Sequence, residues 1–289
     1  MIALEQLRYV RLVADDLGRA ADFAQRVLGL EPIDRTPELA TFRSDFRDYT
    51  LAVAAGNHAV ESVGLEVRYS SDLDAALEAL HRLGVTAGRG SADDCALRKV
   101  KDMVSFTDFS GNRIELVVRP LNSGWRYFPS RDAGIRGLAD VMLRSLDVEK
   151  DLSIWTGILG AQVSDWAGDA AYLRFDDAHH RIVLFPAIRP GILSIEYAVE
   201  NVDLLMRNSY VLRDLQVAVL HGPGRRPASE QLCLTFAGPS HVLFGFVAEG
   251  ADVPEGRRPR QFPAGPTGLC SWGSECKIAE LTDPPTAGR

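Results

Sequence analysis

An internal repeat restricts the fold of this 289-residue chain more than any other feature of the sequence. In the first half, Asp16 opens an amphipathic segment that ends at Gly29; in the second half, Asp147 opens a similar segment that ends at Gly160. The separation is 13 residues in both cases (29 − 16 and 160 − 147). An aspartate before and a glycine after an apolar-periodic run are typical helix start and stop signals.

The repeat continues on both sides of these predicted helices. The strand-like residues 9–12 correspond to 140–143, and the turn and strand at 110–115 correspond to 240–245. The offsets are 131 and 130 residues (140 − 9 and 240 − 110). A constant offset at separated places indicates a duplicated unit.

Each half divides again into two similar units, because a strand–helix–strand pattern restarts near residues 63 and 193. We therefore predict an α+β fold in which four βαβββ modules pair into two barrel-like domains. The predicted boundaries are a first domain at 1–120, a linker at 121–136 and a second domain at 137–248, with the working cavity in the second domain. The remaining residues, 249–289, are rich in Pro, Gly and Arg. They predict an irregular tail that wraps over a domain or contacts a neighbouring subunit.

Composition excludes several functional classes. The net charge of −7 argues against nucleic acid or an anionic membrane as the main partner. No segment approaches the roughly 20 apolar residues of a membrane-spanning helix. The four cysteines lack C-x-x-C spacing, which indicates reduced thiols. We expect a cytoplasmic homo-oligomer whose partner is a small aromatic or phenolic molecule.

Several short motifs carry a resemblance to a known family. They are Ala178-His179-His180-Arg181, Gly222-Pro223-Gly224-Arg225-Arg226, Pro239-Ser240 and Cys270-Ser271-Trp272-Gly273. With the paired modules and the chain length, they resemble the vicinal oxygen chelate superfamily (glyoxalase, bleomycin resistance protein, dioxygenase). Within that superfamily the chain is similar to the two-domain extradiol catechol dioxygenases of the dihydroxybiphenyl type.

The resemblance implies a metal site in the second half, and the sequence departs from it. The family holds iron or manganese with two His and one Glu, and the corresponding positions here are Asp140, Ser194 and Gly245. The first half has Tyr9, Ser62 and Glu115 at its matching positions. We therefore predict that the family metal triad is lost and that neither iron nor manganese is a cofactor. A rebuilt site from Asp140, Glu196 and His180 stays open, although a salt bridge from Glu196 to Arg225 or Arg226 would compete with it.

The resemblance also implies that His180 is an acid–base residue beside the substrate, because the second His of the family pair has that role. An imidazole titrates near neutral pH and can move a proton. Strand alternation from Ile182 predicts that His180 faces the cavity and that His179 faces away, although a surface histidine is the alternative. Of the remaining histidines, His58, His81 and His221 are expected on loop or helix surfaces, and His241 in an exposed turn.

Other predicted site residues surround His180. Asp140 and Glu196 are candidate acid–base partners, whereas Arg225, Arg226, Ser194 and Thr235 are candidate substrate-binding residues. Two arginines suit a carboxylate or an enolate, although a solvated basic turn is an equally good interpretation.

Three functions remain open from the sequence. The first is an extradiol-dioxygenase-like enzyme of aromatic metabolism that acts by metal-independent acid–base chemistry as a lyase, hydrolase, isomerase or cofactor-free oxygenase. The second is a catalytically silent protein that binds a planar aromatic ligand. The third is an extradiol dioxygenase with an atypical metal site. Fold likeness does not decide among them.

Overall fold

The computed structural model describes residues 1–56, 60–254 and 256–283. His58 and the last six residues of the predicted tail lie outside this part of the chain. The first half contains two modules. The first module comprises β1 (Leu4–Ala14), α1 (Leu17–Phe23), the π-helical turn η1 (Ala24–Leu28), β2 (Glu31–Arg35), β3 (Leu39–Arg43) and β4 (Leu51–Ala55). The second comprises β5 (Ser62–Val67), α2 (Ser70–Arg82), β6 (Ala87–Arg89), α3 (Ala92–Arg98), β7 (Asp102–Thr107) and β8 (Arg113–Val118).

The second half repeats this order without a counterpart of α3. Its first module comprises β9 (Ile135–Ser145), α4 (Val148–Gly157), β10 (Gln162–Ala167), β11 (Ala170–Arg174) and β12 (Ile182–Pro186). Its second comprises β13 (Gly191–Val199), α5 (Val202–Asp214), β14 (Val219–Arg225), β15 (Leu232–Ala237) and β16 (Leu243–Ala248).

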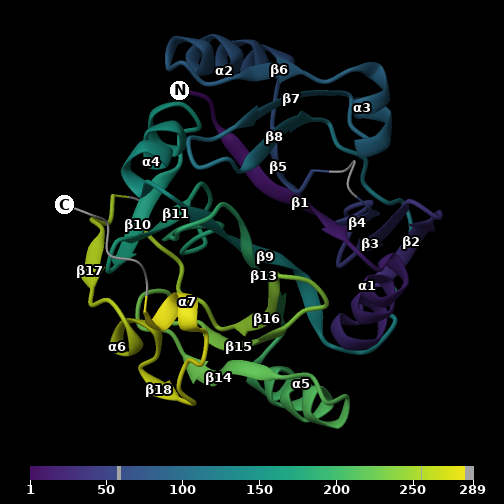
Figure 1. The fold of residues 1–289 in the computed structure, drawn as a ribbon, viewed down its shortest axis with the longest axis vertical. Helices are drawn as coiled ribbons and strands as arrows, with labels where there is room; N and C mark the ends of the chain where they lie inside the picture. The colour runs from purple at the N-terminus through teal and green to yellow at the C-terminus, as the bar shows by residue number, and fades with distance from the viewer. Residues whose placement is uncertain (57–59, 255, 284–289) are drawn as a thin grey trace.

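Each half forms one curved sheet (Figure 1). The first sheet has the order β2-β3-β4-β1-β5-β8-β7-β6, and the second contains the matching order β10-β11-β12-β9-β13-β16-β15-β14. In each sheet two modules meet through one antiparallel pair, β1 with β5 and β9 with β13. The predicted α+β fold is confirmed. The residue boundaries of the two domains stay a prediction.

The helix signals read from the repeat have the expected geometry. Asp16 accepts a hydrogen bond from the Arg19 backbone N–H at 2.9 Å, and Asp147 accepts one from the Lys150 N–H at 3.1 Å. Both aspartates therefore cap their helices. Gly29 takes a φ of +84°, a left-handed conformation that ends η1 and that other residues rarely adopt.

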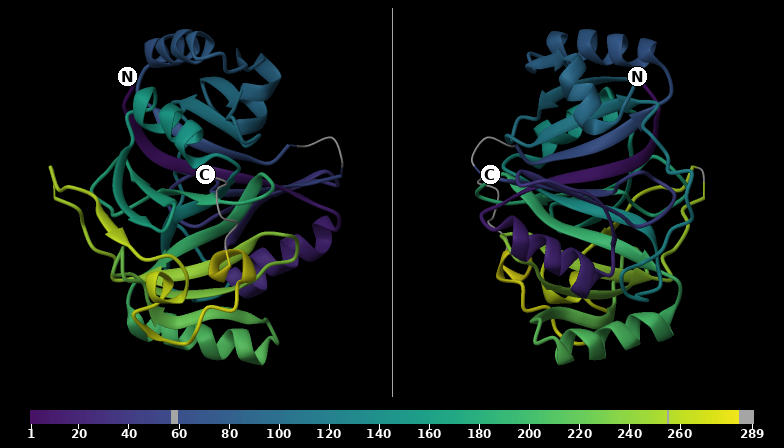
Figure 2. Two further views of the ribbon diagram at one scale, coloured as in Figure 1. Left: turned by 60° about the vertical axis from the view of Figure 1, so that its left-hand side comes forward. Right: turned by 90° about the vertical axis from the view of Figure 1, so that its right-hand side faces the viewer.

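The two halves pack on each other as well as on their own helices. The Phe23 ring of α1 lies 5.3 Å from the Phe244 ring of β16 and 6.3 Å from the Phe236 ring of β15. In Figure 2 the helices α2 and α5 lie at opposite ends of the molecule, with the strands between them. Within the described ranges, no helix is long and apolar enough to cross a membrane.

The tail folds over the second sheet rather than staying irregular. It contributes four short elements: β17 (Arg260–Phe262), α6 (Pro266–Leu269), β18 (Trp272–Gly273) and α7 (Ala279–Thr282). Strand β17 pairs with β10, and β18 pairs with β14. Ile278 and Leu281 join an apolar cluster with inward side chains of the sheet, including Met142, Tyr172 and Val183.

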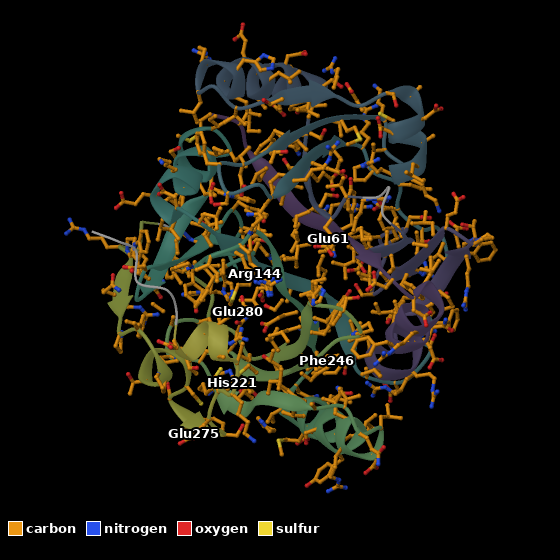
Figure 3. All side chains as sticks on the ribbon, viewed as in Figure 1. Glu61, Arg144, His221, Phe246, Glu275 and Glu280 are labelled. Carbon is orange, nitrogen blue, oxygen red and sulfur yellow. The ribbon has the colours of Figure 1, made fainter. Side chains whose placement is uncertain are left out.

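An ion pair fastens this tail to the sheet. The carboxylate of Glu280 accepts hydrogen bonds from the buried guanidinium of Arg144 at 2.6 and 3.0 Å. Figure 3 shows the two side chains close together between the sheet and α7. The tail therefore covers the inner face of the second sheet, where the sequence predicts the cavity.

Candidate functional site

A row of side chains crosses five strands on the inner face of the second sheet. In register, Asp140 of β9 lies opposite Glu196 of β13, and Glu196 lies beside Gly245 of β16. Gly245 in turn lies opposite Thr235 of β15, which lies opposite His221 of β14. Residues opposite each other on neighbouring strands point to the same face. The five positions therefore form one transverse layer of the site.

The structure places Ser194 outside this row. It lies opposite Met142 and beside Leu243, two residues along β13 from Glu196, so it belongs to the next layer. The pairing of β13 with β9 contains irregular steps between Ile192 and Ser194 and beyond Glu196. Such bulges shift a register by one residue and cannot be counted from sequence. Glu196, rather than Ser194, therefore lies in register with Asp140 and Gly245.

Glu196 and Arg226 form a buried ion pair at the centre of the row. The two guanidinium nitrogens of Arg226 donate to the two carboxylate oxygens of Glu196, one of them at 2.6 Å, and Arg226 also approaches the Thr235 hydroxyl at 3.5 Å. Burial opposes the charge of Arg226, but Glu196 outweighs it and raises the Arg226 pKa well above its ordinary value. The pair brings a permanent cation into the site.

The glycine beside this pair gives the carboxylate its space. A Cβ atom on Gly245 would lie 3.0 Å from a carboxylate oxygen of Glu196 and 3.2 Å from its Cγ. A larger residue at 245 would push Glu196 away from Arg226. The glycine that replaces the predicted third ligand is therefore part of the ion-pair arrangement.

Arg225 does not join the site. Its guanidinium donates to Glu249 at 2.8 Å and lies 5.7 Å from the centroid of the Trp272 ring, at the surface between the sheet and the tail. The interpretation as a solvated basic turn fits Arg225, whereas the pocket interpretation fits Arg226. Thr235, at 2% exposure, lies where the sequence predicts a pocket residue.

Asp140 and His180 lie next to each other, and each has a buried polar atom without a hydrogen-bond partner. The His180 Nε2 atom lies 3.6 Å from the Asp140 Oδ1 atom, just beyond hydrogen-bond range. Nε2 of His180 and Oδ2 of Asp140 are both buried without a hydrogen-bond partner. Burial raises the Asp140 pKa to about 6, and burial with the nearby Arg226 charge lowers the His180 pKa to about 3. The imidazole is therefore neutral at pH 7, and the carboxyl group titrates nearer to neutral pH.

His179 is buried in the structure and does not face away. Its Nδ1 lies 3.0 Å from Nδ1 of His180, and its Nε2 lies 2.8 Å from the Asp165 carboxylate. Burial opposes the charge of Asp165, but hydrogen bonds from Arg260 and His179 hold its pKa below the usual range. Asp165 is therefore ionised and accepts a hydrogen bond from the Nε2–H group of His179.

This network assigns the tautomer of His180. Because Nε2 of His179 donates to Asp165, Nδ1 of neutral His179 has only a lone pair and accepts from Nδ1 of His180. Nε2 of His180 then carries the other lone pair and directs it at Asp140. When Asp140 is protonated its hydroxyl can donate to that lone pair, and when it is ionised two acceptors face one another. The arrangement is suited to taking a proton from a bound ligand.

Strand alternation counted from Ile182 predicted that His180 faces inward. His180 does lie on the inner side of the sheet, but alternation is not the cause. Strand β12 begins only at Ile182, and Ile182 and Leu184 belong to the core on the outer face of the sheet. Val183 and Phe185 face inward instead. His180 precedes the strand, so strand alternation does not set its direction. His221 also departs from its surface prediction, since it is only 2% exposed.

Three participants were not found from the sequence. Asp165 holds His179, Arg260 in turn donates to Asp165, and the Tyr172 ring lies 5.0 Å from the His180 ring in an edge-on contact. An aspartate within the apolar strand β10 was the available signal for Asp165. Arg260 lies in the tail, 95 residues further along the chain, and no local pattern connects the two.

One family model matches part of the first half of the chain. Residues 6–116 match the Glyoxalase/Bleomycin resistance protein/Dioxygenase superfamily. The chain carries a domain of this superfamily. Its sequence is 27% identical over 230 residues to the iron-dependent extradiol dioxygenase of Rhodococcus jostii, covering 70% of this chain and 75% of the relative. It is 27% identical over 269 residues to 3-methylcatechol 2,3-dioxygenase of Pseudomonas putida, covering 86% and 89%.

Solved structures share the fold along nearly the whole chain. The Mn(II)-bound glyoxalase from Novosphingobium aromaticivorans matches with a TM-score of 0.88 at 21% identity, covering 100% of this chain and 97% of the other. Homoprotocatechuate 2,3-dioxygenase from Arthrobacter globiformis matches with a TM-score of 0.85 at 18% identity, covering 97% and 91%. The chain is therefore extradiol-dioxygenase-like in sequence and fold, as the motifs predicted.

The relatives contradict the predicted absence of a metal cofactor. One relative is named iron-dependent and one similar structure holds Mn(II), so the expectation that iron and manganese play no part is wrong. The side chains of the second-domain row nevertheless do not fit such an ion as they stand. Arg226 engages both oxygens of Glu196, and Gly245 supplies no donor. Among residues 1–56, 60–254 and 256–283, no group of three His, Cys, Asp or Glu is placed to hold a metal.

Proposed function

We propose that this protein is an enzyme of aromatic-compound metabolism that removes a proton from a small phenolic or enolic substrate at the second-domain row. The names of its relatives, which include dioxygenases of 3-methylcatechol and of biphenyl-2,3-diol, support the substrate class. The observation that carries the proposal is the pair of unpartnered buried acceptors on Asp140 and His180. A buried polar atom without a partner costs free energy unless a ligand or water satisfies it.

Each residue in this proposal has a defined task. Asp140, with a pKa of about 6, is the general base, and the Nε2 lone pair of His180 accepts the same ligand hydrogen bond. Arg226 stabilises the phenolate or enolate that forms, because its guanidinium stays charged in a buried site. Glu196 orients Arg226. His179 and Asp165 act as positioning residues, since they fix the tautomer of His180.

The proposed test is turnover of a panel of catechols, substituted phenols and ring-cleavage products, with and without added Fe(II) or Mn(II). Asp140→Asn and His180→Gln are expected to lower turnover by about 10²–10⁴, the usual contribution of a general base. His179→Ala is expected to lower turnover as well, because it releases the tautomer of His180. Arg225→Ala is the matched control and is expected to leave turnover unchanged.

Two outcomes would contradict the proposal. If the Asp140 and His180 variants turn over every substrate as fast as the wild-type protein, the row is not the reacting centre. If the wild-type protein binds catechols and transforms none of them, the protein is a silent binder of planar aromatic ligands.

A further inference from the structure

The inner face of the first domain has a row equivalent to the proposed catalytic row. Tyr9 of β1 lies opposite Gly64 of β5, which lies beside Glu115 of β8. Glu115 accepts two hydrogen bonds from Arg98, at 2.6 and 2.7 Å, and one from the Tyr9 hydroxyl at 2.8 Å. Both carboxylate oxygens of Glu115 therefore accept hydrogen bonds, and its negative charge is paired with Arg98.

One layer away, a second arginine has no such partner. Arg11 lies two residues after Tyr9 on β1 and so points to the same inner face. It is 7% exposed, and its buried Nη1 atom has no hydrogen-bond partner. Within the described ranges, its guanidinium forms no ion pair within 4 Å. A guanidinium is always charged, and burying it without a counter-charge costs free energy. A bound anion would therefore stabilise Arg11 at this position.

Two hydroxyl groups without partners accompany Arg11. Ser62 of β5 lies directly opposite Arg11, and its buried Oγ has no partner. The Tyr49 ring stacks on the Tyr9 ring with centroids 5.0 Å apart, and its buried hydroxyl lies beside the Arg11 guanidinium without forming a hydrogen bond of good geometry. A guanidinium and two hydroxyl groups are donors that can converge on one oxyanion.

The charge of the layer and an adjoining pocket favour the same ligand. Arg113 of β8 lies beside Ser62 in register. Its guanidinium donates to the Ser105 hydroxyl at 2.8 Å, and its Nε lies 3.7 Å from the Glu115 carboxylate. Ser62 and Arg113 line a pocket of about 160 Å³ between the two domains. Its one lining carboxyl group is Glu61, labelled in Figure 3, whose pKa burial raises above its ordinary value.

From these contacts we propose that the first domain binds a small carboxylate at Arg11, Ser62 and Tyr49. The carboxylate supplies the negative charge that Arg11 lacks and accepts from both hydroxyl groups. The stacked Tyr9 and Tyr49 rings give this layer an aromatic wall, which suits benzoate better than acetate. This site is separate from the proposed catalytic row and does not depend on it.

The experiment measures the thermal midpoint and calorimetric binding in a buffer without carboxylates, with sodium benzoate, acetate and sulfate as probes. Benzoate is expected to raise the midpoint of the wild-type protein more than acetate, and sulfate at equal ionic strength should not raise it. Arg11→Met is expected to abolish the response to benzoate, whereas the exposed Arg19→Met control should respond like wild type. Ser62→Ala and Tyr49→Phe should each weaken binding by about tenfold, since each removes one hydrogen bond to a charged group.

Arg11→Met is also expected to unfold at a temperature no lower than wild type in the carboxylate-free buffer, because an unpaired buried charge is removed. If it fails to fold, Ser62→Ala and Tyr49→Phe carry the test. A benzoate response that persists in all three variants, or that is missing in the wild-type protein, would overturn the proposal. A response that disappears in Asp140→Asn would also overturn it, by placing the carboxylate in the second domain.

Discussion

At the scale of single residues, Arg226 decides what the second-domain row can hold. Its guanidinium engages both oxygens of Glu196, and the buried polar atoms left without partners belong to Asp140, His180 and His221. A divalent ion at this place would meet a permanent positive charge and a carboxylate that is already paired. The guanidinium and the metal therefore compete for Glu196.

Removing this competition should change metal affinity. In Arg226→Ala, the Glu196 carboxylate loses its guanidinium partner and becomes available to an ion together with the neighbouring Asp140. We expect this variant to bind Mn(II) more tightly than the wild-type protein does, as measured by the loss of the free Mn(II) electron paramagnetic resonance signal. Arg225→Ala is the control with the same loss of charge. Equal affinity in Arg226→Ala and wild type would show that Arg226 does not compete with the ion.

At the scale of elements, α7 of the tail covers the inner face of the second sheet. Its apolar contacts are made by Ile278 and Leu281, and its polar contact is the ion pair of Glu280 with Arg144. The guanidinium holds the pKa of Glu280 below its ordinary value. Because the proposed catalytic row lies on the face that the tail covers, we expect α7 to open when a substrate enters.

Weakening the ion pair should therefore loosen α7. Glu280→Ala leaves the buried Arg144 without its carboxylate partner. We expect backbone amides at 279–282 to exchange with deuterium several times faster than in the wild-type protein, since a lost contact worth about 1 kcal/mol changes a local opening equilibrium roughly fivefold. Glu275→Ala, an exposed change in the same tail, is the control. Unchanged exchange in Glu280→Ala would show that apolar packing alone holds the tail.

The elements also show how far sequence reasoning could go. Periodicity and helix caps predicted the four modules, because Asp16, Gly29 and their counterparts act locally. Which residues share the row depends on the register between strands. The bulges of β13 place Glu196, and not Ser194, opposite Asp140. The tail elements and α3 lacked a strong periodic signal. The contact of Arg260 with Asp165 depends on tertiary folding alone.

At the scale of the whole molecule, the duplicated domains have buried Glu–Arg pairs at matching layers, Glu115 with Arg98 and Glu196 with Arg226. In the first domain the carboxylate lies on β8 and in the second on β13, so the pairs are not copies of one ancestral contact. Only the second row adds unpartnered acceptors on an aspartate and a histidine. The cytoplasmic location and the homo-oligomeric state stay predictions.

Because only the second row has these unpartnered acceptors, we expect a substitution in the first row to change stability and not turnover. Glu115→Gln removes the charge that pairs with buried Arg98, and breaking a buried pair is expected to cost about 3–5 kcal/mol of unfolding free energy. Turnover by the protein that remains folded should change little, because Glu115 lies outside the proposed catalytic row. Urea denaturation and turnover per folded molecule check both statements. A loss of turnover with unchanged stability would place the first domain in the reaction.

The most direct test of the account is the visible spectrum of a bound nitro-substituted catechol whose colour reports its ionisation. Below pH about 6 Asp140 is protonated and cannot take the ligand proton, whereas above it the carboxylate can. We therefore predict that the bound catechol becomes anionic as the pH rises through about 6, at values where the free compound is still neutral. Asp140→Asn should leave the bound catechol neutral over that range. An anionic spectrum in Asp140→Asn, or a neutral one in the wild-type complex above that pH, would contradict the account.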